Sequence, residues 1–142
     1  MREVCKWDYK TKDGNVIGHV IRLEDENKLE GSKSRKSIIP YFKEGGQSGI
    51  PDDLSPEYRI YGMDSVKDLS ETIYIVEGEK CAAALHGLGY QAITSLGGTG
   101  QGKFADWSVI DGAADVVLLP DNDSVGLLFM QGVYGRIKNF RS

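Results

Sequence analysis

The sequence predicts an α/β fold, with a small antiparallel β-rich subdomain followed by a parallel sheet flanked by helices. In residues 1–42, apolar and polar residues alternate in the way that is typical of half-buried strands. From residue 72 onward, short apolar runs alternate with helical patterns, an order typical of βαβ units and a parallel sheet. Glycine and proline mark residues 44–58 between these parts as a turn-rich linker.

The composition is that of a globular protein, and the 142 residues suffice for one domain with a small appendage. No apolar run approaches the ~20 residues that span a bilayer and no signal peptide is recognised, so we expect no membrane partner. Cys5 and Cys81 form neither a disulfide framework nor a zinc-ligand pattern, which favours a reducing, cytoplasmic location. Cys81 falls in an expected helix, where we expect it to be packed.

The net charge of −4 argues against a nucleic-acid-binding surface that covers the whole protein. A local basic cluster is present at Lys28, Lys33, Arg35 and Lys36. This cluster is compatible with a nucleic-acid track, but a solvated loop is the favoured interpretation.

The β-rich part is expected to contain three strands. The first lies around residues 5–9, and the Asp13-Gly14 pair predicts a hairpin turn into the second at residues 16–23. A charged loop follows at residues 24–36, and the third strand is expected at residues 37–42. We assign residues 1–70 to this subdomain and its linker.

The second part, residues 71–142, is expected to form the parallel sheet. Buried strands are predicted at residues 72–76, 91–95 and 115–119. A helix is predicted at residues 79–88, with Ala82, Leu85 and Leu88 on its apolar face and Gly89 at its end. A weaker helix is expected at residues 103–109, and a last one from a Ser124 cap to about residue 139. Since the chain stops after that helix, we expect a fragment whose sheet domain is truncated at its C-terminus.

Carboxylates follow two of the predicted strands. The run Ile73-Tyr74-Ile75-Val76 ends at Glu77, and Val116-Val117-Leu118-Leu119 is followed by Asp121 and Asp123. Ligands of open α/β sheets bind at the carboxyl ends of the strands, so these side chains are expected to converge there. Carboxylate oxygens suit Mg²⁺ or Mn²⁺, and a third carboxylate can act as a general base. An isolated Asp-Asn-Asp would more simply be a polar turn; two acidic strand ends favour a metal site.

Residues near these carboxylates suit phosphate. Glycine lets the backbone approach a phosphate closely, and Gly78 and Gly126 are placed for this. Lys80, in the first turn of the expected helix, is a candidate catalytic residue that would neutralise a phosphate, although a surface lysine is an equally simple interpretation. We also expect Gly97, Gly98 and Lys103, which belong to a glycine-rich loop and its end, to bind phosphate or nucleic acid.

Three ordered motifs together resemble a Toprim domain. They are Ile-Tyr-Ile-Val-Glu-Gly-Glu-Lys at residues 73–80, Ser-Leu-Gly-Gly-Thr at residues 95–99, and Leu-Pro-Asp-Asn-Asp-Ser-Val-Gly at residues 119–126. Toprim is the catalytic module shared by bacterial-type primases, topoisomerases and certain nucleases. The motif sequences here are most similar to those of phage and plasmid primases or primase-helicases. The resemblance covers roughly residues 71–139, and the β-rich segment is similar to the region that precedes Toprim in those primases.

The resemblance implies specific roles. Glu77 corresponds to the family's glutamate, a general acid/base and at times a metal ligand, and Asp121 and Asp123 correspond to its DxD metal ligands. Gly97 and Gly98 sit in its glycine motif. The implied activity is Mg²⁺-dependent nucleotidyl transfer as the catalytic module of a DNA primase, with single-stranded template DNA and nucleoside triphosphates as partners and a replicative helicase as a further one. A nuclease-like module and a non-catalytic domain that binds nucleic acid or a protein partner are the alternatives.

A rival motif overlaps the glycine-rich loop. Residues 97–103 satisfy the phosphate-binding pattern G-x-x-x-x-G-K, and Asp121 could imitate the acid of a second nucleotide-binding motif. However, Phe104 stands where that loop needs a Ser or Thr hydroxyl, and Glu77 is left without a role. P-loop nucleotide binding is therefore the least favoured interpretation.

Overall fold

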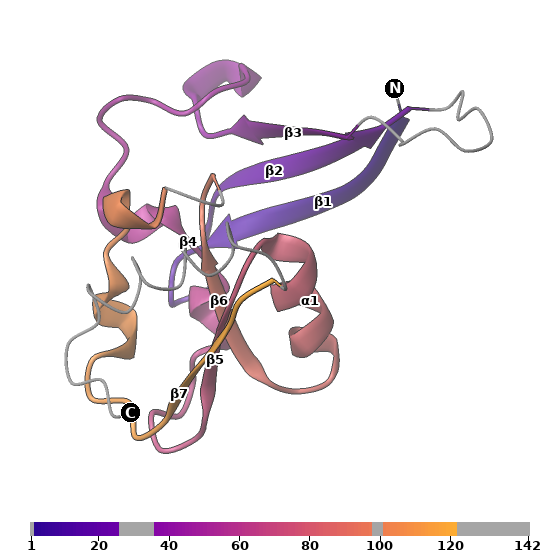
Figure 1. Ribbon diagram of the computed structural model, residues 1–142. Helices are drawn as coiled ribbons and strands as arrows, with labels where there is room; N and C mark the ends of the chain where they lie inside the picture. The colour runs from indigo at the N-terminus through magenta and orange to yellow at the C-terminus, as the bar shows by residue number, and fades with distance from the viewer. Residues whose placement is uncertain (1, 26–35, 98–100, 122–142) are drawn as a thin grey trace.

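A computed structural model describes residues 2–25, 36–97 and 101–121, and its described part has an α/β fold built on two sheets (Figure 1). The first is an antiparallel sheet of β1 (Arg2–Lys10), β2 (Val16–Glu24) and β3 (Lys36–Tyr41), in that order. The second sheet has the order β4-β6-β5-β7, with β4 at Ile60–Tyr61, β5 at Ile73–Val76, β6 at Gln91–Ser95 and β7 at Val116–Leu119. The predicted fold class is confirmed.

The first two strands form the predicted hairpin. Gly14 has a φ of +91°, and its N–H donates to the Thr11 carbonyl at 2.9 Å. In the resulting register Trp7 lies opposite Val20. Trp7, Tyr9 and Val20 are buried. The predicted alternation of residues 5–9 is therefore confirmed.

The second sheet is mostly parallel, as predicted, but it gains an antiparallel strand at one edge. β5 runs parallel to both β6 and β7, whereas β4 runs antiparallel to β6. The sequence did not predict β4, because two residues are too few to show a period. Residues 1–70 thus contribute one strand to the second sheet.

The α-helix α1 (Glu79–Gly87) follows β5, and Gly89, with a φ of +87°, lies just beyond its end as predicted. The expected apolar face is shorter than predicted, because Leu88 is 72% exposed. The helix predicted at residues 103–109 is wrong. Two 3₁₀ turns, Gly102–Phe104 and Trp107–Ile110, stand there instead, since Ala105 between them is extended. The last predicted helix lies outside the described residues.

The strand β7 is less buried than predicted. Val116, Val117 and Leu118 are half-buried, and Leu119 is 42% exposed. The reason is its place at the edge of the described sheet, where a strand has only one strand neighbour. The prediction of full burial holds for the central strand β5, where Ile73 and Ile75 are fully buried.

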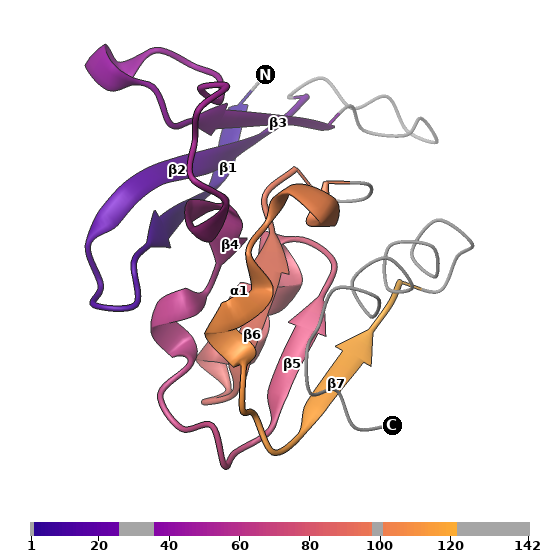
Figure 2. The same cartoon turned by 90° about the vertical axis from the view of Figure 1, so that its left-hand side faces the viewer.

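Two apolar clusters pack the faces of the second sheet. Figure 2 shows the segment with the 3₁₀ turns of residues 102–110 in front of this sheet and α1 behind it. On one face, the 3₁₀ turn Trp107–Ile110 packs against Ile60, Ile73, Ile75 and Ile93. On the other face, α1 and the first sheet meet the second sheet through a cluster of Trp7, Tyr9, Val20, Phe42, Tyr61, Val76, Ala82, Ala92 and Leu96. This second cluster fixes the antiparallel sheet against the end of the second sheet that carries the predicted site. Among the described residues, no helix combines the length and the apolar character that crossing a membrane requires.

Candidate functional site

The structure brings two of the predicted site residues together. Glu77 follows β5 and Asp121 follows β7, and these strands pair directly, with Val76 opposite Leu119. The backbone N–H of Asp121 donates a hydrogen bond to Oε2 of Glu77. Both residues therefore stand at the carboxyl edge of the sheet, where the sequence places them. Asp123, Gly98 and Gly126 lie outside the described residues.

A glycine shapes the loop that carries Glu77. Gly78 has φ +85° and ψ 154°, a conformation that is open essentially to glycine alone. Its N–H donates to Oγ1 of Thr94 on β6 at 3.1 Å, and Thr94 is fully buried. The loop is thus anchored to the neighbouring strand just before α1 begins at Glu79.

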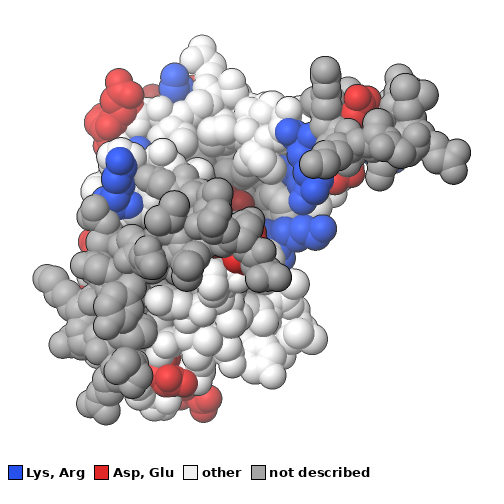
Figure 3. Space-filling view, in the orientation of Figure 1, with Lys and Arg blue, Asp and Glu red and all other residues white. Residues whose placement is uncertain are grey.

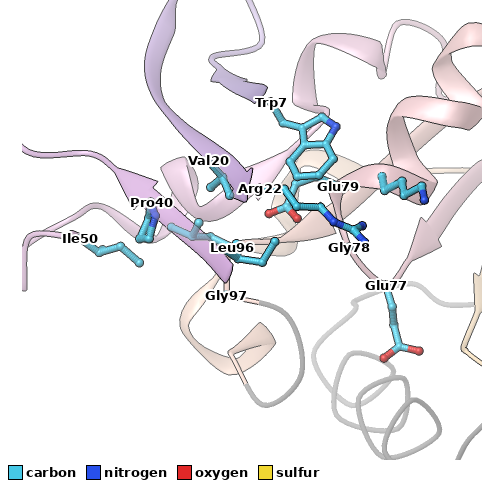
Figure 4. Close-up of a pocket in the computed structure, with 12 residues that line it drawn as sticks. Trp7, Val20, Arg22, Pro40, Ile50, Glu77, Gly78, Glu79, Leu96 and Gly97 are labelled. Atoms are coloured by element: carbon cyan, nitrogen blue, oxygen red, sulfur yellow. The ribbon is translucent and has the colours of Figure 1, made fainter. Parts of the chain in front are cut away.

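A cleft of about 430 Å³ opens beside this loop, between the first sheet and the segments that follow β5 and β6 (Figure 4). The first sheet and the segment after it supply a mainly apolar wall of Trp7, Val20, Arg22, Ile38, Pro40 and Ile50. The opposite wall is formed by Glu77, Gly78, Glu79, Lys80, Leu96 and Gly97. Four predicted site residues therefore line one cleft.

The carboxylate of Glu79 is held from the first sheet. The Tyr9 hydroxyl donates to its Oε1 at 2.8 Å. Burial raises the pKa of Tyr9 well above its ordinary value of 10, and the negative charge of Glu79 raises it further. Burial likewise raises the pKa of Tyr61 to about 12, with contributions from the charges of Asp64 and Glu79. Both tyrosines consequently remain protonated at neutral pH, so Tyr9 is the donor in this bond.

Two cleft residues were missed by sequence reasoning as site residues. Neither Trp7 nor Arg22 was among the predicted site residues, yet both line the cleft. The Arg22 guanidinium forms an ion pair with Glu24 at 3.1 Å, and its Nε is buried without a hydrogen-bond partner among the described residues. The period of two along β2 was a usable signal, because it places Arg22 on the face of Val20.

The described residues of the glycine-rich segment lie in different surroundings. Gly97 lines the cleft with a φ of +87°, whereas Lys103 is exposed with its Nζ 5.2 Å from the centroid of the Phe104 ring. Gly102–Phe104 is a single 3₁₀ turn and not the start of an α-helix, which disfavours the P-loop interpretation.

The charges around the site are mixed. On the face shown in Figure 3, Lys and Arg side chains of the described residues gather in small separate patches and not in one continuous band. Within residues 2–25, 36–97 and 101–121, no three His, Cys, Asp or Glu side chains form a group that could hold a metal ion. Of the three predicted metal ligands, the structure describes Glu77 and Asp121, whereas Asp123 lies outside the described residues.

Comparison with known proteins identifies the architecture. No family model matches the chain, and no curated protein matches its sequence. A solved structure of "the DnaG catalytic core" is similar to it with a TM-score of 0.59 over 92% of this chain, at 20% sequence identity. The chain has a DnaG-like fold. It spans 39% of the length of that DnaG chain. At this identity the likeness shows the fold, and it places both the antiparallel sheet and the mixed sheet within one known architecture.

Proposed function

We propose that this chain is a primase-type Toprim module that carries out Mg²⁺-dependent nucleotidyl transfer on nucleic acid. The observation that carries the proposal is the pairing of Glu77 with Asp121 at the carboxyl edge of a parallel sheet in a DnaG-like fold. The motif resemblance and the structural likeness rest on different comparisons, one of local residues and one of the backbone. Both support the proposal of a primase-type protein.

The residues present fit a hard divalent cation. Mg²⁺ takes oxygen ligands and usually one or two carboxylates, leaving its other positions to water and phosphate. Glu77 is half-buried and Asp121 is exposed, and both side chains offer only oxygen donors. We assign the ion to Glu77, Asp121 and Asp123. When bound, it would neutralise charge on the phosphates of the substrate.

The protein's own groups supply the rest of the mechanism. Glu77, oriented by the Asp121 N–H, would accept the proton of a 3′-hydroxyl that attacks the α-phosphate of a nucleoside triphosphate. The bond from the α-phosphorus to the α–β bridging oxygen would break, and pyrophosphate would leave. Lys80 is exposed on the first turn of α1 and lines the cleft, where its ammonium would pair with phosphate oxygens. Gly78 allows close approach of the backbone at the same place.

The partners follow from this chemistry. Single-stranded template DNA and nucleoside triphosphates are the proposed substrates, and the apolar wall of the cleft suits the faces of unpaired bases. A replicative helicase, as an attached domain or a separate protein, is the proposed protein partner, as the resemblance to primase-helicases implies.

The first test is a titration of Mg²⁺ and Mn²⁺ followed by backbone amide NMR. We expect saturable shifts at residue 77 and at residues 121–123 in the wild type, and their loss in the variants Glu77→Gln and Asp121→Asn/Asp123→Asn. Glu71→Gln is the matched control, because Glu71 is an exposed acid that precedes β5 at the opposite end of the strand. A wild type without saturable shifts would overturn the metal-dependent function.

Primer synthesis is then measured on a single-stranded template with nucleoside triphosphates. New RNA that depends on Glu77 and Asp121 supports the primase-type reaction. Cleavage of the labelled template with the same dependence would instead establish the nuclease alternative.

A further inference from the structure

A large aromatic side chain is exposed next to two cations. Phe104 is 47% exposed, although phenylalanine is usually buried. The Cζ of Arg59 lies 5.7 Å from the centroid of its ring, and the Nζ of Lys103 lies 5.2 Å from it. Both distances fall within the range of cation–π attraction. We refer to Arg59, Lys103 and Phe104 as the aromatic–cation cluster.

The backbone that presents the cluster is fixed. The indole N–H of Trp107, a buried residue, donates to the Gly102 carbonyl at 2.9 Å. The N–H of Asp106 donates to the Pro56 carbonyl at 3.0 Å, which ties this segment to the 3₁₀ turn Pro56–Arg59. The backbone on either side of Phe104 is therefore held by hydrogen bonds, which lowers the cost of ordering this segment on binding.

The cluster lies on the same edge of the sheet as Glu77. The Leu96 N–H donates to the Arg59 carbonyl at 2.8 Å, which places Arg59 at the carboxyl end of β6. Leu96 also lines the cleft. Arg59 directly precedes β4, and the sheet order β4-β6-β5 puts β4 two strands from β5, which Glu77 follows. At ordinary strand spacing the two backbones are roughly 10 Å apart.

We propose that the aromatic–cation cluster is a stacking site for an unpaired base of single-stranded DNA whose strand continues into the cleft. A base would stack on the Phe104 ring in place of a cation that lies over it, and Arg59 and Lys103 would then offer their charges to the neighbouring phosphates. A purely apolar partner would have to desolvate both cations, whereas a nucleotide satisfies the ring and the charges together. This inference rests on the proposed function for the identity of the strand.

The test is fluorescence anisotropy of a labelled oligothymidine in the presence of a chelator, so that no metal site contributes. We expect Phe104→Ala to weaken binding about tenfold, and Phe104→Trp to retain it, because stacking needs only an aromatic ring. The logarithm of the association constant falls linearly with the logarithm of the salt concentration, and Lys103→Gln should make this fall shallower by about 0.7. Phe104→Ala should leave the salt dependence unchanged. The matched control is Leu88→Ala, the truncation of another large exposed apolar side chain, which should bind like the wild type.

A second arm uses duplex DNA, whose bases are already stacked. Phe104→Ala should not change its binding. Equal binding of oligothymidine by Phe104→Ala and the wild type would overturn the stacking site. The same holds if Phe104→Ala loses equal affinity for single strand and duplex, or if the wild type does not bind oligothymidine. None of these outcomes bears on the Mg²⁺-induced amide shifts, so the stacking site and the proposed function fail separately.

Discussion

The hydroxyl of Tyr9 on β1 donates a 2.8 Å hydrogen bond to Oε1 of Glu79 at the start of α1. The Tyr9 ring is fully buried, with its centroid 5.1 Å from that of Phe42 and 5.4 Å from that of Tyr61. Glu79 lies two residues after Glu77. The bond therefore connects the antiparallel sheet to the loop that carries the candidate catalytic carboxylate.

Replacing Tyr9 with Phe should lower the free energy of unfolding by about 1–2 kcal/mol, because one charge-assisted hydrogen bond is lost while the ring packing is kept. Urea unfolding measures the change. Tyr58→Phe is the control, since Tyr58 is half-buried and its hydroxyl has no hydrogen bond within the part of the chain that the structure describes. Equal losses in the two variants would show that the bond to Glu79 contributes nothing.

The same tyrosines predict a loss of stability in alkali. The folded protein raises the pKa of Tyr9 well above 10 and that of Tyr61 to about 12, so above pH 10 the unfolded chain releases protons that the folded protein retains. This contribution is complete below pH 10 and declines above it, by about 1.4 kcal/mol per pH unit for each retained proton. Urea unfolding below and above pH 10 should show a shallower decline for Tyr9→Phe than for the wild type. Identical slopes would contradict the raised pKa of Tyr9.

The conformation of Gly78 makes a prediction that depends on the backbone alone. A Cβ at Gly78 meets no atom within 4 Å, so the cost of Gly78→Ala comes from the backbone conformation and should be roughly 1–3 kcal/mol. Gly87 has the same open surroundings but lies within α1, without a positive φ. Gly87→Ala should therefore be neutral or stabilising by up to about 1 kcal/mol. Thermal or urea unfolding of both variants measures these changes in the free energy of unfolding. A Gly78→Ala variant as stable as Gly87→Ala would contradict the prediction, because the Gly78 loop would then accept alanine.

The sequence predicted the meeting of Glu77 and Asp121 because the geometry involved is local and general. Apolar runs indicate buried strands, and parallel strands bring their carboxyl ends to one edge. The cleft beside them was not predictable in this way. It depends on the packing of β1 and β2 against residues that are some seventy positions away, as in the contact between Tyr9 and Glu79. No short-range pattern encodes such a contact, so Arg22 and Trp7 were not recognised as cleft residues.

The secondary structure shows the same difference between features that the local sequence predicts and features that depend on distant contacts. Strands β1, β2, β3, β5, β6 and β7 were predicted to within three residues at each end, since each has a clear apolar pattern. β4 exists only through its pairing with β6, and the turns at residues 102–110 depend on the packing of Trp107 in the core and on the hydrogen bond from Asp106 to Pro56. In these places, interactions between distant segments outweighed local propensity.

A last prediction concerns Cys81, which the sequence led us to expect in the packed face of its helix. The structure leaves it exposed, because successive residues of an α-helix are turned by about 100° and the neighbouring Ala82 takes the buried position. Cys5, on β1, is half-buried. A thiol-reactive dye should therefore label the native protein in a fast phase and a slow phase, and Cys81→Ser should remove only the fast one. In urea both thiols should react alike. A fast phase that survives in Cys81→Ser would mean that Cys5 is the accessible thiol.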